Sequence, residues 1–517
     1  MNIRESNLYS LWAAVCSLYE ESLLHRILKA AGGWCSRQID DSFILEPLCR
    51  EGVVARSWGG SLTCRVLTAA VNLPGWLLHR LYCAFQTAFD GSFFANLAFE
   101  MGAETAIAES WIILLLWVIP FSHWNNAYNL LGFLLLLALF YIRGMREEKA
   151  RLDVRAAGFY SVVFFGAVCL AVPLSAYPSM SLRFLMYHVI CVLCVLVTVS
   201  SVRCGEDLKR LAAGGGFVVL VSSAYGIYQR IQGVAVNKSY VDVTLNEGMP
   251  GRVESFFDNP NTFAEVLILL LPLLVALTLC AKHWYSKVAA GGIFLIGAAA
   301  LGMTYSRASW VGIAVAAAVF VFLWKPKLIP AFIVLCVACV PLLPSTIWNR
   351  ILTIANTSDS STASRVPLYE AAVRVIRREP VSGAGLGTAA VQRYIADWNL
   401  YHAKAPYVHS HNIYLEVWVE TGILGLAGFF ASMLWNIKNA ARQVRHSQDS
   451  AARTITAACA ASLCGAMVAG LADYLWNYPR VMSMFWFVFA LAIAGVKVCR
   501  GAVGAAADAA EPAPAEQ

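Results

Sequence analysis

One segment of the chain begins with two histidines and continues as an apolar run with helical spacing: His409-Ser410-His411-Asn412-Ile413-Tyr414-Leu415-Glu416-Val417-Trp418-Val419-Glu420-Thr421-Gly422-Ile423-Leu424-Gly425. At 3.6 residues per turn, one stripe of this helix carries His411, Leu415, Trp418, Gly422 and Gly425. Small residues let a neighbouring membrane helix approach closely, so we expect a helix contact at the two glycines. The pattern predicts a membrane helix with an imidazole at its aqueous end. The alternative is that His411 only caps this helix.

The composition is that of a polytopic membrane protein. The chain has 517 residues, of which 59% are hydrophobic and 14% are charged, whereas soluble proteins carry about 25% charged residues. The net charge of +7 is divided among the loops, as orientation in a membrane requires, and it does not indicate a nucleic-acid partner. Most of the 15 cysteines lie in apolar segments, where they are expected to be core residues rather than metal or redox sites.

About twelve apolar segments are long enough to span a membrane. Residues 107–347 are expected to hold transmembrane helices 1–9, and residues 411–500 helices 10–12. The region 1–106 has apolar residues at helical spacing among charged ones, which predicts amphipathic helices on the inner membrane surface or a small cytoplasmic helical domain. The tail 501–517 is rich in Ala, Pro and Glu and is expected to be disordered. The approximate cores of the spans are 107–122, 127–142, 157–176, 183–202, 211–229, 262–281, 286–304, 308–324, 328–347, 412–436, 455–474 and 481–499.

The distribution of Lys and Arg predicts the orientation of these spans. Basic residues follow the second, fourth, sixth, eighth, tenth and last spans. They all lie on one side of the membrane if both termini are cytoplasmic. The two long loops, 230–261 and 348–410, then face outward, and both are longer than common connections. We expect the second of them to be a long helical periplasmic loop.

Candidate functional residues occur at the predicted outer ends of the spans. Arg252 precedes Asn259-Pro260-Asn261-Thr262, which reads as a helix N-cap with proline at the first helical position. Such a helix end can hold a phosphate, although a simple helix start explains the pattern equally well. Arg307 lies between two apolar spans, where an arginine is costly unless it forms a pair or serves a site.

The stretch around His411 resembles a bacterial family. O-antigen ligases, O-antigen polymerases and related O-oligosaccharyltransferases share the loose pattern His-[Asn/Ser/Gln]-x9-Gly-x-x-[Gly/Thr/Tyr], which here reads His411-Asn412, nine residues, Gly422-Ile423-Leu424-Gly425. The turn at Ser306-Arg307, the helix led by Arg365 and the glycine-rich turn 380–387 resemble the same family. The resemblance covers roughly residues 250–430, and the best match is O-antigen ligase.

The resemblance implies an all-α, GT-C-like membrane glycosyltransferase of lipopolysaccharide biosynthesis in the bacterial inner membrane. Its donor would be a glycan on undecaprenyl diphosphate, and its acceptor lipid A core, another glycan or a protein. Arginine binds phosphate bidentately, and histidine can take a proton from a hydroxyl. His411 is therefore the expected catalytic base of an inverting displacement. The expected substrate-binding residues are Arg252, Arg307, Arg365, His409 and Tyr414.

The chain has no Asp-x-Asp pair, which argues against a divalent cation, so we expect no metal. We also expect no cofactor. A Wzy-type polymerase and a protein O-oligosaccharyltransferase remain related alternatives. A transporter or flippase of lipid-linked sugars is an alternative of another class, and it would place ionisable residues near the membrane midplane. Most polar residues here lie at the outer ends of the spans, but Glu265, Glu416 and Glu420 keep the transporter alternative open.

Overall fold

The structure of the chain confirms the predicted all-α class. Every regular element among the described residues is a helix, as expected where lipid leaves backbone polar groups no partner outside their own segment. The computed structural model describes residues 14, 17–40, 53–148, 150–236, 250–342, 344–352, 363–404 and 406–510. Parts of both predicted outer loops, at 237–249 and 353–362, therefore lie outside the described residues.

Each of the twelve predicted apolar segments corresponds to a helix. Within the described ranges, nine helices are long and apolar enough to cross a membrane. The number of actual crossings stays a prediction, since three of the twelve apolar helices are shorter. The nine long helices are α9 (Ala127–Arg146), α12 (Pro178–Ser201), α13 (Gly205–Gln232), α14 (Pro260–Cys280), α15 (Trp284–Met303), α16 (Arg307–Trp324), α22 (Ile413–His446), α23 (Ser450–Ala469) and α24 (Pro479–Ala510), and the shorter three are α8 (Thr105–Trp117), α11 (Phe159–Leu174) and α17 (Ile329–Cys339).

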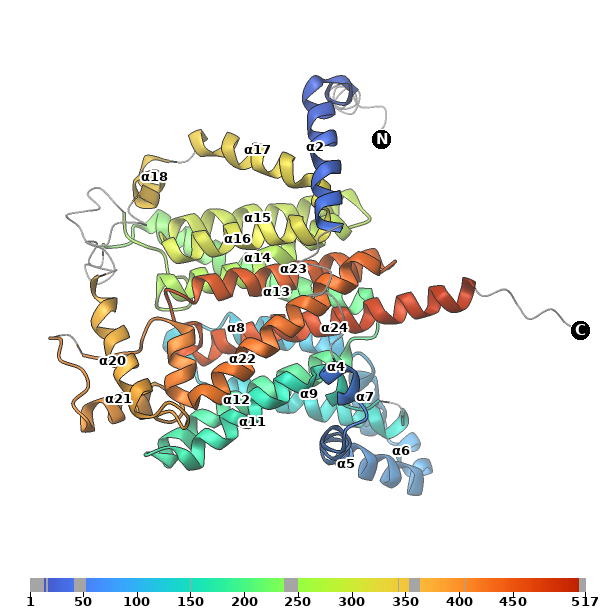
Figure 1. Cartoon of the computed structure of the whole chain (residues 1–517). Coiled ribbons are helices and arrows are strands. Elements are labelled where there is room, and N and C mark those ends of the chain that lie inside the picture. Colours follow the sequence, from blue (N-terminus) through green and yellow to red (C-terminus); the bar gives the residue numbers. More distant parts are fainter. Residues whose placement is uncertain are drawn as a thin grey trace, which may run out of the picture.

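The long helices lie side by side in one bundle (Figure 1). The most buried spans are α14, α23 and α24, and they form its centre. Small residues bring α16 and α23 into close contact, because a Cβ built on Gly312 would lie 2.8 Å from the carbonyl oxygen of Gly465. Aromatic rings fill the space between α11 and α24, where Phe164 stacks on Trp486 with centroids 5.5 Å apart.

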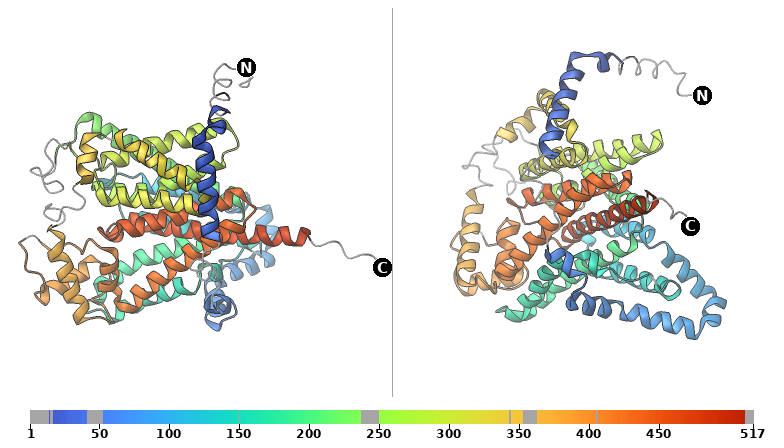
Figure 2. Two further views of the ribbon diagram at one scale, coloured as in Figure 1. Left: turned by 45° about the horizontal axis from the view of Figure 1, so that its top comes forward. Right: turned by 45° about the vertical axis from the view of Figure 1, so that its right-hand side comes forward.

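One end of the bundle carries a small helical cap. It consists of α18 (Ser345–Leu352), α20 (Arg365–Arg378) and α21 (Thr388–Asp397), which lie to the left of the bundle in Figure 1. Both views of Figure 2 place the C-terminal end of α24 far from this cap. The described part of the predicted loop 348–410 thus carries helices joined by turns, and it lies at one end of the bundle. We call this the cap end.

The N-terminal helices lie near the other end of the bundle (Figure 1). They are α2 (Leu23–Asp40), α4 (Val53–Trp58), α5 (Leu62–Ala84), α6 (Gln86–Gly91) and α7 (Phe93–Ala103). Figure 1 shows α5 end-on, whereas the bundle helices run across the page. It therefore runs across their direction and not along it, although its place at a membrane surface stays a prediction. At the other terminus, α24 continues through Ala510, so the first part of the tail expected to be disordered is helical, in keeping with the high helix propensity of alanine.

Candidate active site

His411 lies directly before α22 rather than within it. Asn412 is the N-cap, and its side-chain oxygen accepts hydrogen bonds from the backbone N–H groups of Tyr414 and Leu415, both at 3.0 Å. His411 itself has a φ of 49°, an uncommon backbone conformation for a residue other than glycine. The expectation that His411 shares a helix stripe with Trp418 is therefore wrong. The capping alternative is also wrong, because Asn412 supplies the cap.

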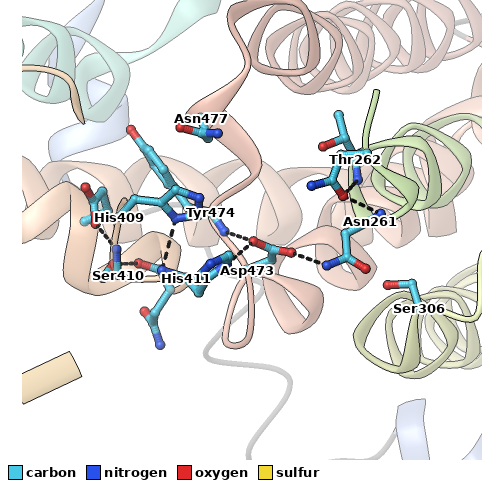
Figure 3. Close-up of polar contacts among 12 residues, drawn as sticks. Asn261, Thr262, Ser306, His409, Ser410, His411, Asp473, Tyr474 and Asn477 are labelled. Atoms are coloured by element: carbon cyan, nitrogen blue, oxygen red, sulfur yellow. Dashed lines mark hydrogen bonds and ion pairs between the residues drawn. The ribbon is translucent and has the colours of Figure 1, made fainter. Parts of the chain in front are cut away.

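An aspartate that the sequence analysis did not single out orients His411. His411 Nδ1 lies 2.9 Å from Asp473 Oδ1 (Figure 3), and Asp473 belongs to the segment between α23 and α24. A carboxylate only accepts hydrogen bonds when ionised, so it favours the ring form with the proton on Nδ1 and the lone pair on Nε2. Burial raises the pKa of Asp473, but the charge and hydrogen bond of His411, together with Arg365, outweigh it and hold the pKa below its usual range.

His409, one of the expected substrate-binding residues, lies against His411. The two ring centroids are 4.1 Å apart, and the His411 backbone N–H donates to His409 Nδ1 at 3.2 Å. Burial, with the nearby charge of His411, lowers the pKa of His409 to about 3. His409 is thus neutral at ordinary pH, with Nδ1 as an acceptor, and it stabilises the turn that presents His411.

Two glutamates of α22 hold the segments that carry His411 and Asp473. The Ser410 backbone N–H donates to the Glu416 carboxylate at 2.8 Å, and the Tyr474 hydroxyl donates to Glu420 at 2.9 Å. These are two of the three carboxylates that kept the transporter alternative open. In the structure each accepts a hydrogen bond from a segment at the cap end.

Four arginines converge beside this pair. Arg252, Arg307, Arg350 and Arg365 line a cavity of about 250 Å³ at the cap end of the bundle. The described residues that line this cavity, which we call the arginine cavity, include no carboxylate. Its volume is below the roughly 300–1,000 Å³ of common small-molecule sites, so it suits a compact anionic group. The sequence analysis named three of these arginines and missed Arg350, which lies in α18 outside any quoted motif.

A chain of hydrogen bonds joins the arginine cavity to His411. The Arg252 guanidinium donates to the side-chain oxygen of Asn261 at 2.5 Å and to the carbonyl of Thr304 at 2.6 Å. The Asn261 side-chain N–H then donates to Asp473 Oδ2 at 3.1 Å (Figure 3). The predicted N-cap is confirmed two residues earlier, where the side chain of Asn259 accepts from the N–H groups of residues 261 and 262. This helix end positions the amide that links arginine to aspartate.

The glycines of the motif shape α22. Gly422 has φ 68° and ψ −174°, so the helix bends there. The turn 380–387 docks at the bend: the Ala384 N–H donates to Val419 O at 2.7 Å, and the Ile423 N–H donates to Pro380 O at 3.0 Å. A Cβ on Gly422 would overlap the carbonyl of Val381. The close neighbour expected at Gly422 is therefore this turn and not another helix.

Tyr414 lies away from the arginine cavity. Its ring stacks on Phe430 with centroids 4.9 Å apart, and its hydroxyl donates to the carbonyl of Met467 at 2.6 Å. The stacking lies within α22, and the hydrogen bond ties α22 to α23 below His411. A role for Tyr414 in substrate binding stays a prediction, whereas its part in positioning α22 follows from the contacts.

Comparison with known families decides how this geometry is interpreted. Residues 292–430 match the family model described as O-Antigen ligase. This match supports an O-antigen ligase-like family. The resemblance seen in the motifs is thereby confirmed for this region, and the match supports a membrane glycosyltransferase of the ligase/polymerase type. No curated protein matches the chain.

The ligase-like region holds only part of the site. It contains His411, Arg307 and Arg365, while Arg252 and Asp473 lie outside the matched residues. The structure alone brings these two to the same place. The sequence indicates a role for Arg252 through its position before a predicted helix cap. Asp473 carried no local signal, because its role depends on a contact 62 residues along the chain.

His409, His411 and Asp473 could also hold a metal ion, since one ligand atom from each lies within 4.8 Å of the others. Two histidines and a carboxylate are a common zinc ligand set. In this arrangement, however, His411 Nδ1 is hydrogen-bonded to Asp473, and His409 Nδ1 accepts from the His411 backbone. The three groups thus already satisfy one another, which favours a proton-transfer arrangement. A chelation experiment distinguishes the two interpretations.

Proposed function

We propose that the protein transfers a glycan from undecaprenyl diphosphate to an acceptor hydroxyl, and specifically that it ligates O-antigen to lipid A core. The observation that carries this proposal is the His411–Asp473 pair, with Nδ1 and Oδ1 2.9 Å apart, linked to a cavity lined by four arginines. The pair provides a base, and the cavity provides a place for a diphosphate. The ligase-like family match supports a transfer reaction that uses both the base and the diphosphate-binding cavity.

In the proposed reaction, the acceptor hydroxyl lies at His411 Nε2. The imidazole takes the hydroxyl proton while the oxygen attacks the anomeric carbon of the donor. The bond from this carbon to the diphosphate oxygen breaks, and the leaving diphosphate keeps the electron pair. The configuration at the anomeric carbon inverts, since there is one displacement. Asp473 stabilises the imidazolium that forms.

The arginine cavity is proposed to hold the diphosphate. Arg252, Arg307 and Arg365 are the predicted binding residues, and Arg350 is added because it lines the same cavity. Guanidinium groups form paired, charge-assisted hydrogen bonds with phosphate oxygens. Fixed positive charges beside the departing diphosphate would stabilise its developing charge without reorganisation.

The cap end is proposed to face the periplasm, with both termini in the cytoplasm. Basic side chains support this orientation, because Arg143 lies near the end of α9 that is remote from His411 and Arg203 directly follows α12. Lys497 of α24 lies at the same level, since it donates to the carbonyl of Val199 near the end of α12. A fluorescent protein that matures only in the cytoplasm, fused after residue 517, should fluoresce. A dark fusion at normal expression would reverse the orientation.

The decisive test is transfer with purified components. The protein in detergent is mixed with an undecaprenyl-diphosphate-linked glycan and lipid A core, and product is followed by mass spectrometry. Product on lipid A core is expected. A lengthened lipid-linked glycan would indicate a polymerase, and a glycosylated protein acceptor would indicate a protein transferase. If the protein, reconstituted in vesicles, moved the donor between leaflets without forming a new bond, it would be a transporter and not an enzyme.

A further inference from the structure

A second cavity lies at the end of the bundle opposite His411. It has a volume of about 650 Å³ and is lined by α5 and by the segment 148–155 that follows α9. This volume is within the range of sites that bind small molecules. The cavity lies in the N-terminal part of the protein, outside residues 292–430 that match the ligase family, and it serves no step of the proposed transfer. We call it the α5 cavity.

The α5 cavity is rich in arginine. Arg65, Arg151 and Arg155 line it, together with one carboxylate, Glu148, which pairs with Arg151 at 3.6 Å. The ion pairs found in the described part of the chain include neither Arg65 nor Arg155. The cavity therefore carries a net positive charge. Gly59 makes room for one of these groups, because a Cβ there would overlap the Arg155 guanidinium.

The walls of the α5 cavity are held in place by hydrogen bonds between α5 and the following segment. The Asn72 side chain donates to the carbonyl of Leu152 at 3.0 Å and accepts from the Leu152 N–H at 2.7 Å. His79 Nδ1 lies 2.7 Å from the carbonyl of Met145. The Tyr141 hydroxyl of α9 donates to the backbone of α5 at 2.5 Å. These contacts fix the segment of Arg151 and Arg155 against α5, which carries Arg65, so the cavity exists before any ligand arrives.

An apolar surface adjoins the basic cavity. Large apolar side chains are exposed along α5 at helical spacing, and Trp76 is both exposed and part of the cavity lining. α5 runs across the direction of the bundle helices and not along it (Figure 1), as does an amphipathic helix lying in a membrane interface. The exposed residues are Leu62, Val66, Leu73, Trp76, Leu77, Leu81 and Phe85.

We propose that the α5 cavity binds the phosphate headgroup of an anionic phospholipid, with the acyl chains along the apolar face of α5. Charge and shape both point to this ligand: the arginines match the phosphodiester, and the exposed apolar side chains match the chains beside it. Basic pockets at the membrane surface bind anionic headgroups in this way. Free inorganic phosphate offers the same charge without the chains, and the experiment separates the two.

The test uses the full-length protein purified in a neutral detergent. Its thermal unfolding midpoint is measured while phosphatidylglycerol, or phosphatidylcholine with the same acyl chains, is added to the micelles, because a ligand of the folded state stabilises it. Phosphatidylglycerol should raise the midpoint and phosphatidylcholine should not. In the double variant Arg65→Gln/Arg155→Gln, the apparent affinity for phosphatidylglycerol should fall by about fivefold or more per charge removed.

The matched control is Lys282→Gln/Lys287→Gln, which removes two exposed charges at the α14–α15 turn outside the cavity. It should keep the wild-type response. The variant Arg65→Lys/Arg155→Lys retains both charges. It should therefore bind phosphatidylglycerol with most of the wild-type affinity, provided that the glutamine variant is folded and has lost binding through the loss of charge. Equal responses to the two lipids, equal losses in the control, or full reproduction of the effect by millimolar inorganic phosphate would each overturn the proposal.

Discussion

Replacing Asp473 by asparagine tests the proposed base most directly. The aspartate accepts from His411 Nδ1 at 2.9 Å, from Asn261 at 3.1 Å and from the Tyr474 N–H at 2.9 Å. The side-chain oxygen of an asparagine can still accept hydrogen bonds, but its amide can also donate to His411 Nδ1. The ring proton would then move to Nε2, the atom that must be free to take a proton from the acceptor.

The size of the effect follows from two contributions. A hydrogen bond to a charged group contributes about 1.5–3 kcal/mol, which corresponds to roughly 10- to 100-fold in rate if it is made in the transition state. Loss of the correct ring form removes part of the general-base contribution, which is on the order of 10²–10⁴. We therefore expect Asp473→Asn to reduce kcat on the order of 10²–10³, with KM for the donor nearly unchanged.

The assay is transfer from lipid-linked glycan to lipid A core by the purified variant, with kcat and KM measured across pH. Asp397→Asn is the matched control, because Asp397 is also a hydrogen-bonded carboxylate at the cap end and contacts Tyr177 and Arg393 instead. Its rate should stay within about twofold of wild type. A folded Asp473→Asn variant with wild-type kcat would refute the orienting role of Asp473.

His411→Asn should lose transfer on the order of 10²–10⁴ and keep its unfolding midpoint, since asparagine tolerates the left-handed backbone; native transfer would move the base elsewhere. Arg307→Lys and Arg365→Lys should each lose on the order of 10², whereas Arg378→Lys, whose guanidinium lies over Trp398, should not, and equal losses in all three would point to general destabilisation. Transfer should survive dialysis against a chelator; a loss that an added divalent cation restores would indicate a metal at the histidine pair. Below pH 6.5 the unfolded state protonates the His409 ring while the folded state, with its pKa near 3, does not, so stability should fall by about 2 kcal/mol between pH 6.5 and 5. His409→Asn, which keeps an acceptor for the His411 N–H, should flatten this decline in the unfolding midpoint, and an unchanged slope would contradict the assignment.

Sequence periodicity predicted the helices well, because a segment that spans lipid must satisfy its own backbone hydrogen bonds and therefore forms a helix. Each apolar run of spanning length became a helix, and the cap at Asn259 followed from local chemistry that requires no distant partner. The same reasoning placed His411 in a helix, where it is not. The helix starts two residues later because Asn412 is the better cap, and the preceding turn is fixed by His409 and Ser410. Helical periodicity does not show at which residue the helix begins, so it cannot reveal that His411 lies outside the helix.

Long-range contacts account for what the sequence did not predict. Asp473 reaches His411 from the segment between α23 and α24, and Arg350 enters the arginine cavity from a short helix of the cap. Neither residue lies in a local pattern that indicates its role. The glycine-rich turn was identified correctly as a turn, but its partner was not, because only the assembled structure shows that it docks at the bend of α22.

Asp473 connects the proposed base to the arginine cavity. Asp473 accepts from His411 through one oxygen and from Asn261 through the other, and Asn261 in turn accepts from Arg252. In the proposed reaction, positive charge develops on His411 while negative charge develops on the diphosphate beside Arg252. The aspartate lies between the two and is held ionised by the positive charges around it. It therefore stabilises the imidazolium at the moment when the arginines stabilise the leaving group, so neither charge has to develop without a fixed partner.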